Sequence, residues 1–240
     1  LRKNYLFPAK MNNDEQNQIY LDVTYTMGVT GITGIPRVVT ELAKTGVSQG
    51  ILPFFLFDSQ AYFYNSVSDA VELVVITDNI TFFYPDAAWN YPGDFISTLQ
   101  KIKKCGGKSV ILIYDLIPLL YPGLSNQNHV DAFERWFEIS KNYSHRLLCI
   151  SEAVSDELVE LINSCQRNLL NHWHIGWAHL GCDFDDSRID DENNIQPDAK
   201  ALQIPYFVAV GTVEPRKAYS ITIDAMEQIW QRGQDASFVI

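Results

Sequence analysis

The chain has few cysteines, fewer basic than acidic residues and no long apolar stretch, and each of these shortages excludes a class of protein. Its 4 cysteines in 240 residues form no Cys-x-x-Cys pair, so we expect reduced thiols rather than a disulfide framework. Its 18 Lys and Arg against 29 Asp and Glu give a formal net charge of −11, which repels the phosphates of nucleic acids. No stretch reaches the roughly 20 apolar residues of a transmembrane helix.

Glycine and proline are also sparse, at 13 and 10 residues, which excludes a low-complexity or collagen-like chain. Hydrophobic residues make up 47% of the sequence, and the length is sufficient for one large domain or two modest ones. We therefore expect a globular protein. Cys149 lies in an apolar stretch and is predicted to be a small buried side chain on a strand.

Apolar and β-branched runs alternate with helical periodicities along most of the chain. Strands are predicted at residues 19–25, 51–57, 61–64, 71–76, 109–114, 145–150, 173–180, 206–210 and 237–240. Helices are predicted at residues 35–47, 95–104, 127–143, 151–169 and 220–232. Residues 77–92, which contain Pro85 and Pro92, are predicted to form a loop. The alternation predicts a doubly wound α/β fold, in which ligands bind at the carboxyl ends of parallel strands.

The composition also predicts a domain organisation. Residues 1–18 are polar and aperiodic, which is typical of an irregular tail, and residues 19–183 carry the alternation expected of one Rossmann-like domain. The acidic stretch 184–203 interrupts that alternation and is predicted to be a linker. Residues 204–240 then begin a second domain. Because the first residue is not Met and the last residues have the composition of a strand, we expect the chain to be part of a longer protein.

A glycine-rich loop precedes the first predicted helix. It places Gly28, Gly31 and Gly34 at intervals of three, where glycines allow close approach of a ligand and the helix N-terminus offers free N–H groups to an anion. The spacing differs from the G-x-G-x-x-G of dinucleotide-binding proteins and from the P-loop, which disfavours a dehydrogenase and an NTPase. The alternative is a flexible turn beside an exposed Arg37.

Polar residues follow two later strands. Asp115 comes directly after strand 109–114, where its carboxylate either accepts hydrogen bonds from a sugar or caps the following turn. Ser151 and Glu152 follow strand 145–150 and either contact the same ligand or, for Ser151, cap the helix that begins there.

The loop after strand 206–210 combines Gly211 with two adjacent cations, Arg216 and Lys217, at the start of a helix. Positive charges at a helix N-terminus oppose the helix dipole by some tenths of a kcal/mol each. A phosphate ligand would explain them. The alternative is a solvated basic turn.

Five segments resemble, in the same order, motifs of the retaining glycosyltransferases of family 4. They are TGITGIPRVVTEL, YDLIPLLYP, CISEAVSDEL, GCD at 181–183 and YFVAVGTVEPRKAYSITIDAMEQIWQRG at 206–233. The last segment matches the family's G-T-x-E-P-R-K-N/G motif, with Ala218 in place of the final Asn or Gly. Tyr114 stands where many relatives have His.

The resemblance implies a GT-B fold of two Rossmann-like domains and a retaining transfer of a hexose from a nucleotide sugar, with GDP-mannose as the expected donor. The acceptor would be a glycan or a lipid-linked glycan in cell-surface polysaccharide synthesis, and the enzyme would be cytoplasmic, either free or at the inner face of the membrane. No metal and no nucleic-acid partner is implied. Part of the donor site, the family's paired-glutamate motif, is expected beyond Ile240.

The resemblance also implies roles for single residues. Asp115, Arg216 and Lys217 are the expected catalytic residues. The donor would contact Gly31, Gly34, Gly211, Thr212, Glu214, Arg216 and Lys217. The acceptor side would consist of Arg37, Tyr114, Asp115, Ser151 and Glu152. The alternative function is a catalytically silent module that binds an acceptor or a partner.

Overall fold

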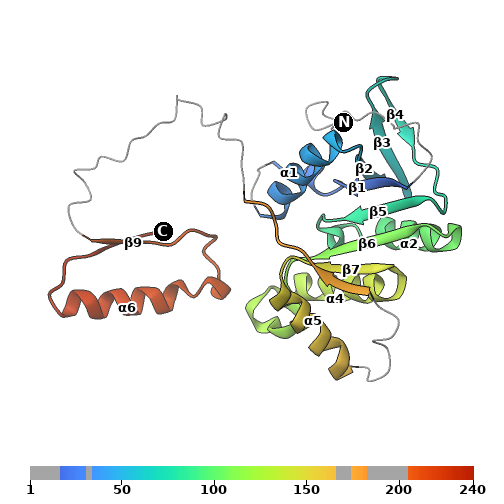
Figure 1. The fold of residues 1–240 in the computed structure, drawn as a ribbon. Coiled ribbons are helices and arrows are strands. Elements are labelled where there is room, and N and C mark those ends of the chain that lie inside the picture. Colours follow the sequence, from blue (N-terminus) through green and yellow to red (C-terminus); the bar gives the residue numbers. More distant parts are fainter. Residues whose placement is uncertain (1–16, 31–33, 166–173, 183–204) are drawn as a thin grey trace. The chain divides into compact units, whose positions relative to one another are not determined.

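The structure is a computed structural model that describes residues 17–30, 34–165, 174–182 and 205–240 (Figure 1). The chain divides into two compact units. The first comprises Leu1–Pro122 and Asn126–Leu180, and the second comprises Gly123–Ser125 and Gly181–Ile240.

An eight-stranded sheet forms the centre of the first unit, in the order β4-β3-β2-β1-β5-β6-β7-β8. Its strands are β1 (Gln18–Asp22), β2 (Leu52–Phe57), β3 (Gln60–Asn65), β4 (Ala70–Leu73), β5 (Ile80–Tyr84), β6 (Lys108–Ile113), β7 (Arg146–Cys149) and β8 (His174–Trp177). Six strands are parallel, whereas β3 and β4 extend one edge as antiparallel strands. The two-residue turn Asp58-Ser59 joins β2 to β3, and both residues have positive φ, as this tight type of hairpin requires.

Helices cover both faces of this sheet. They are α1 (Ile35–Ser48), α2 (Pro92–Cys105), α3 (Ile117–Leu120), α4 (Gln127–Tyr143) and α5 (Glu152–Cys165). Since neighbouring residues of a strand point to opposite faces, Leu21 packs with α1 on one face and Tyr20 lies in the larger core with α2 and α4 on the other. The mixed α/β fold with a largely parallel sheet confirms the predicted fold class, a Rossmann-like domain.

The prediction that residues 77–92 form a loop is wrong. They contain β5, which lies between β1 and β6 near the middle of the sheet. Burial alternates along β5, and its residues Phe82 and Tyr84 are buried in the core. Pro85 follows the last residue of β5, and Pro92 is the first residue of α2. Neither proline lies within the strand, so neither excludes it.

Aromatic rings fill the larger core. The ring of Phe82 stacks on that of Tyr20 with centroids 5.5 Å apart, and it meets the edge of Phe54 at 5.0 Å. Cys149 is fully buried on β7, as predicted. Burial raises the pKa of its thiol to about 12, so the side chain acts as a small apolar group.

The second unit contains a strand–helix–strand arrangement. The parallel strands β9 (Tyr206–Val208) and β10 (Ser237–Val239) pair with each other, and α6 (Tyr219–Gln231) connects them. The 3-10 turn η8 (Pro215–Lys217) lies just before α6. Tyr219 and Met226 are the buried residues of the helix.

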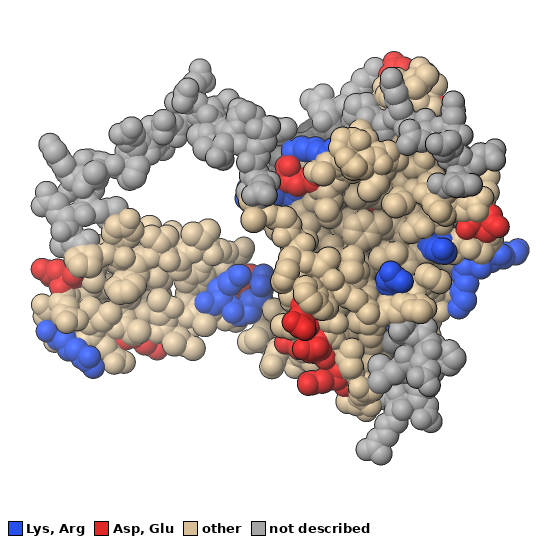
Figure 2. All heavy atoms as spheres, in the orientation of Figure 1, with Lys and Arg blue, Asp and Glu red and all other residues tan. Residues whose placement is uncertain are grey.

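Acidic and basic side chains occupy separate areas of the surface. On the face drawn in Figure 2 most of the surface is uncharged, and the acidic and the basic side chains form small groups of their own. Of the helices that the structure describes, none combines the length and the apolar character needed to cross a bilayer; the longest, α4, has 17 residues.

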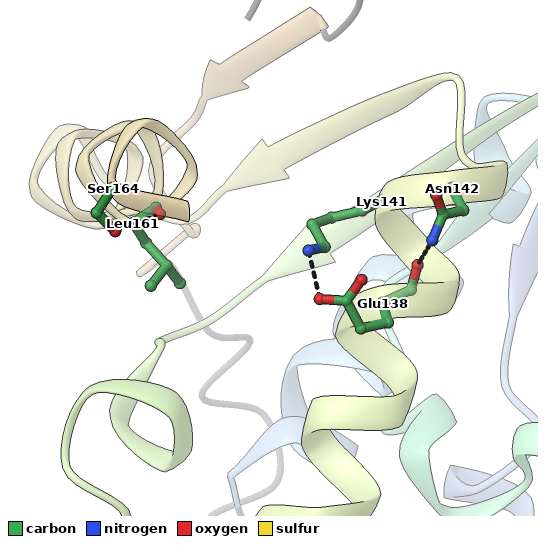
Figure 3. Close-up of polar contacts among 5 residues, drawn as sticks. All are labelled: Glu138, Lys141, Asn142, Leu161 and Ser164. Atoms are coloured by element: carbon green, nitrogen blue, oxygen red, sulfur yellow. Dashed lines mark hydrogen bonds and ion pairs between the residues drawn. The ribbon is translucent and has the colours of Figure 1, made fainter. Parts of the chain in front are cut away.

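The last turns of α4 and α5 carry local polar contacts (Figure 3). Lys141 forms an ion pair with Glu138, and Asn142 Nδ2 donates to the carbonyl oxygen of Glu138 at 2.7 Å. In α5, Ser164 Oγ donates to the carbonyl oxygen of Leu161 at 2.7 Å. Because α4 ends shortly before β7 begins, the contacts at its last turn lie at the amino edge of the sheet. An ion pair between residues three positions apart stabilises a helix by about 0.5 kcal/mol at most.

Candidate functional site

The topology places a switch point between β1 and β5. From β1 the chain runs to β2 on one side, whereas β5 pairs with β1 on the other side. In open α/β sheets ligands bind at the carboxyl ends of the strands at such a point. Two carboxylates that sequence reasoning missed lie there: Asp22 is the last residue of β1, and Asp86 follows β5.

Asp22 is completely buried. Its Oδ1 accepts hydrogen bonds from the backbone N–H of Thr24 at 3.1 Å and from the Thr24 hydroxyl, and its Oδ2 accepts one from the Tyr91 hydroxyl. Burial raises the pKa of Asp22 to about 7, and the negative charge of Asp86 adds to this shift. The hydrogen bonds from Thr24 and Tyr91 oppose it.

Asp86 is 2% exposed and accepts hydrogen bonds at both oxygens. Thr26 donates twice, from its backbone N–H at 2.8 Å and from its hydroxyl at 3.0 Å, and Ala87 N–H donates at 2.9 Å. Burial raises the pKa of Asp86, and these donors oppose the shift. Among the described residues no three His, Cys, Asp or Glu side chains are grouped so as to hold a metal ion.

The buried state of Asp22 gives the first unit a characteristic pH dependence. Because the folded protein raises the pKa of Asp22 from 3.8 to about 7, the folded state binds this proton more tightly than the unfolded state. Its contribution to stability is therefore complete below pH about 4 and is lost as the pH rises through 7. We expect the difference in unfolding free energy between wild type and Asp22→Asn to change by at least about 1 kcal/mol between pH 4 and 7.5 in urea titrations. Asp156→Asn, at an exposed position of α5, should leave this pH profile unchanged.

An apolar pocket of about 600 Å³ opens beside the switch point. Its lining comes from the segment after β1 (Thr24, Met27 and Gly28), from the end of β2 (Phe55, Leu56 and Phe57) and from Tyr62 and Val71 of the antiparallel strands. The volume is within the range of small-molecule sites. Since its walls carry no charged side chain, the pocket suits an apolar or aromatic group and not a phosphate.

The glycine-rich loop is only partly described. Gly31 lies outside the described residues, whereas Gly34 precedes α1 with φ of 59°, a conformation that favours glycine. The carbonyl oxygen of Gly34 accepts hydrogen bonds from the N–H groups of Arg37 and Val38 at 3.1 and 3.3 Å. Arg37 is exposed in the first turn of α1. Binding of an anion by this loop stays a prediction.

Asp115 and Tyr114 come after β6. Asp115 Oδ1 accepts a hydrogen bond from Ile117 N–H at 3.1 Å, so the capping alternative is observed for one of its oxygens. The Tyr114 hydroxyl donates to the carbonyl oxygen of Pro85 at 2.8 Å, and burial raises the pKa of Tyr114 above its usual value. Contact with a sugar stays a prediction for both residues.

Ser151 and Glu152 come after β7. Ser151 Oγ accepts a hydrogen bond from Val154 N–H at 3.3 Å, as an N-cap does, and Glu152 is exposed in the first turn of α5. Because β6 and β7 are parallel neighbours, these residues and Asp115 belong to the same edge of the sheet as Asp22 and Asp86. The topology therefore gathers the expected acceptor side on one edge.

The remaining predicted residues belong to the second unit and surround the start of α6. Arg216 Nη2 pairs with Glu214 Oε1 at 2.7 Å, and both side chains are about one-third exposed. Thr212 and Lys217 are exposed. Lys and Arg side chains gather at the end of this unit where α6 begins (Figures 1 and 2). The structure thus presents cations at a helix N-terminus, which is a suitable arrangement for an anion.

Gly211 lies next to the side chains of Lys217 and Tyr219. The Tyr219 hydroxyl donates to the carbonyl oxygen of Gly211 at 3.0 Å. A Cβ at position 211 would lie 3.3 Å from that hydroxyl and 3.5 Å from Cε of Lys217. A Cβ at this position would therefore crowd the Tyr219 hydroxyl, whereas its contact with Lys217 would be an ordinary van der Waals contact.

Ala218 has φ of 53°, in the left-handed region that costs a non-glycine residue about 1 to 2 kcal/mol. This explains in physical terms why Asn or Gly suits the position after the lysine. We expect Ala218→Gly to raise the opening free energy of α6, measured by native-state hydrogen exchange, by about 1 kcal/mol. Ala225→Gly, at an exposed position within the same helix, should lower it by about as much. An equal decrease in both variants would contradict the left-handed conformation.

Comparison with known proteins gives similarity to mannosyltransferases. No protein-family model matches the chain. The sequence is 24% identical, over 88% of its length, to a serotype-specific mannosyltransferase, WbdA, of Escherichia coli, of which the match covers 28%. A second WbdA sequence gives the same identity with 27% of its length covered, and a third is 24% identical over 70% of this chain and 20% of its own length. The chain thus spans less than a third of these relatives, and its similarity is to one region of a larger glycosyltransferase.

Proposed function

We propose that this chain is the acceptor-side domain and the start of the donor-binding domain of a retaining glycosyltransferase with the GT-B fold. It would transfer a hexose, mannose from GDP-mannose, to a glycan or lipid-linked acceptor during synthesis of a cell-surface polysaccharide. The observation that carries this proposal is the similarity to the E. coli mannosyltransferases over 88% of the chain. The Rossmann-like sheet, with polar residues at its carboxyl edge, agrees with it.

In the proposed transfer, the bond between the anomeric carbon of the donor sugar and the diphosphate oxygen breaks, and the nucleoside diphosphate leaves with the electron pair. An acceptor hydroxyl forms the new bond on the same face of the sugar, and its proton passes to the departing diphosphate. Arg216 and Lys217 would offset the charge that develops on that group, in place of a metal ion. Glu214 supports this role because its ion pair holds the Arg216 guanidinium in one orientation.

The first unit would contribute the acceptor side. Asp115 would accept a hydrogen bond from the transferred sugar through the oxygen that does not bond to Ile117 N–H. Arg37, Tyr114, Ser151 and Glu152 would lie along the acceptor. The glycine loop, with Gly31 and Gly34, would approach the donor phosphates. We place the reaction in the cytoplasm or at the inner face of the membrane; the exposed thiol of Cys105 agrees with a reducing compartment.

The test is a transfer assay with the protein in its natural full length. GDP-mannose and a mannose-containing oligosaccharide acceptor should give an elongated product, and UDP-glucose should give none. Nuclear magnetic resonance of the product should show the α configuration of the donor, as retention requires. A protein that binds the oligosaccharide but transfers no sugar from any nucleotide donor would be the silent acceptor-binding module instead.

A further inference from the structure

The segment between β1 and α1 is attached to both neighbours of β1 in the sheet. On the β2 side, Leu56 N–H donates to the Thr24 hydroxyl at 3.0 Å. On the β5 side, Asp86 accepts both hydrogen bonds from Thr26, a residue 60 positions away in the sequence. Val23 N–H also donates to the carbonyl oxygen of Phe54 in β2 at 2.9 Å. Two further bonds are local, from Met27 N–H to Val23 O and from Gly28 N–H to Tyr25 O, both at 2.9 Å.

We propose that Asp86 is a positioning residue that fixes Thr26, Met27 and Gly28 at the switch point and thereby shapes the acceptor side of the site. This inference rests on the proposed function, which places the acceptor at the carboxyl edge of the sheet. Met27 and Gly28 line the apolar pocket of about 600 Å³, so the position of this segment determines one wall of that pocket.

The chemistry of Asp86 fits this role better than that of a neutral residue. All of its hydrogen-bond partners are donors, and they use both oxygens. An asparagine would have to turn an N–H₂ group towards one of these N–H or O–H donors, which would leave that bond unmade. Asp86 is buried close to Asp22, a second buried carboxyl group, and burying two such groups together costs folding free energy. Hydrogen bonds from donors that are held in place offset this cost.

Three variants of the full-length protein test the proposal. Asp86→Asn removes one acceptor site, Thr26→Val removes the hydroxyl donor at nearly constant shape, and Thr26→Ser keeps that donor as the matched control. Hydrogen exchange at the amides of residues 26–28 should become at least tenfold faster in Asp86→Asn and about fivefold faster in Thr26→Val. Exchange at Tyr20 and Leu21 of β1 should not change, and Thr26→Ser should match the wild type.

Steady-state kinetics supply the second readout. Asp86→Asn and Thr26→Val should raise the KM for the acceptor at least fivefold and change kcat less than twofold, at a temperature at which every variant is folded. Accelerated exchange with an unchanged KM would assign Asp86 a purely structural role and overturn the inference, as would unchanged exchange at residues 26–28. If the wild type itself transfers no sugar, the proposed function fails, and the inference fails with it. If the wild type transfers sugar but the variants have an unchanged KM, only the inference is refuted.

Discussion

Phe82→Ala is expected to lower the unfolding free energy of the first unit by about 3 to 5 kcal/mol. Phe82 is fully buried on β5, between a stacked Tyr20 and the edge of Phe54. Truncation to alanine removes most of its buried apolar area and leaves a cavity in a sheet that is held on both sides of β5 by main-chain hydrogen bonds. Urea denaturation followed by circular dichroism measures the loss.

The matched control is Phe57→Ala, because Phe57 is a phenylalanine on the neighbouring part of the same sheet but is 68% exposed. Its truncation should change the unfolding free energy by less than about 1 kcal/mol. Two equally small effects would mean that residues 77–92 form a surface loop after all and that the order of the sheet is different.

Lys217→Ala is expected to reduce the turnover of the full-length transferase at least tenfold. In the proposed mechanism the Lys217 ammonium offsets the charge of the departing diphosphate, and tenfold corresponds to roughly 1.4 kcal/mol of transition-state stabilisation. Since that charge grows only as the glycosidic bond breaks, kcat should fall with kcat/KM, and the KM for the donor should change less. Initial rates with GDP-mannose measure both parameters.

Arg232→Ala is the control for this prediction. Arg232 is exposed at the opposite end of α6, so its loss removes the same charge from the second unit without affecting the turn at Pro215–Lys217. Turnover should stay within about twofold of the wild type. Equal losses in the two variants would indicate a general effect of net charge, and no loss in Lys217→Ala would leave η8 as a solvated basic turn.

Most of the fold could be predicted from the sequence because its signals are local. Glycine at position 106, with φ of 80°, ends α2, and the apolar run at residues 109–114 corresponds to a strand buried on both faces. The prediction of a loop at residues 77–92 is wrong at β5 because Pro85 and Pro92, which suggest a loop, both lie after the strand. The β-branched and aromatic composition of residues 80–84, ITFFY, was a signal in its favour.

The site was harder to predict, for a different reason. Asp86 acquires its role from Thr26, and this pairing exists only once β5 lies beside β1. Asp22, a polar residue within the predicted strand 19–25 and the last residue of β1, was a local sign of the switch point. By contrast, the cap at Ser151 and the turn at Asp115 follow from adjacent residues, so sequence reasoning could state those alternatives in advance.

The order of the strands also has a consequence for the time course of folding. Among the described strands of this sheet β1 is synthesised first, and it occupies a central position. Its partner β5 ends only at Tyr84, after the three strands β2, β3 and β4 have been made. Until then one edge of β1 has no partner strand, and closing the sheet requires contacts between distant parts of the chain. Such long-range parallel pairing makes folding slow relative to that of proteins with local contacts. The antiparallel strands from β2 to β4 are joined by short connections and can form while the rest of the sheet is still being synthesised.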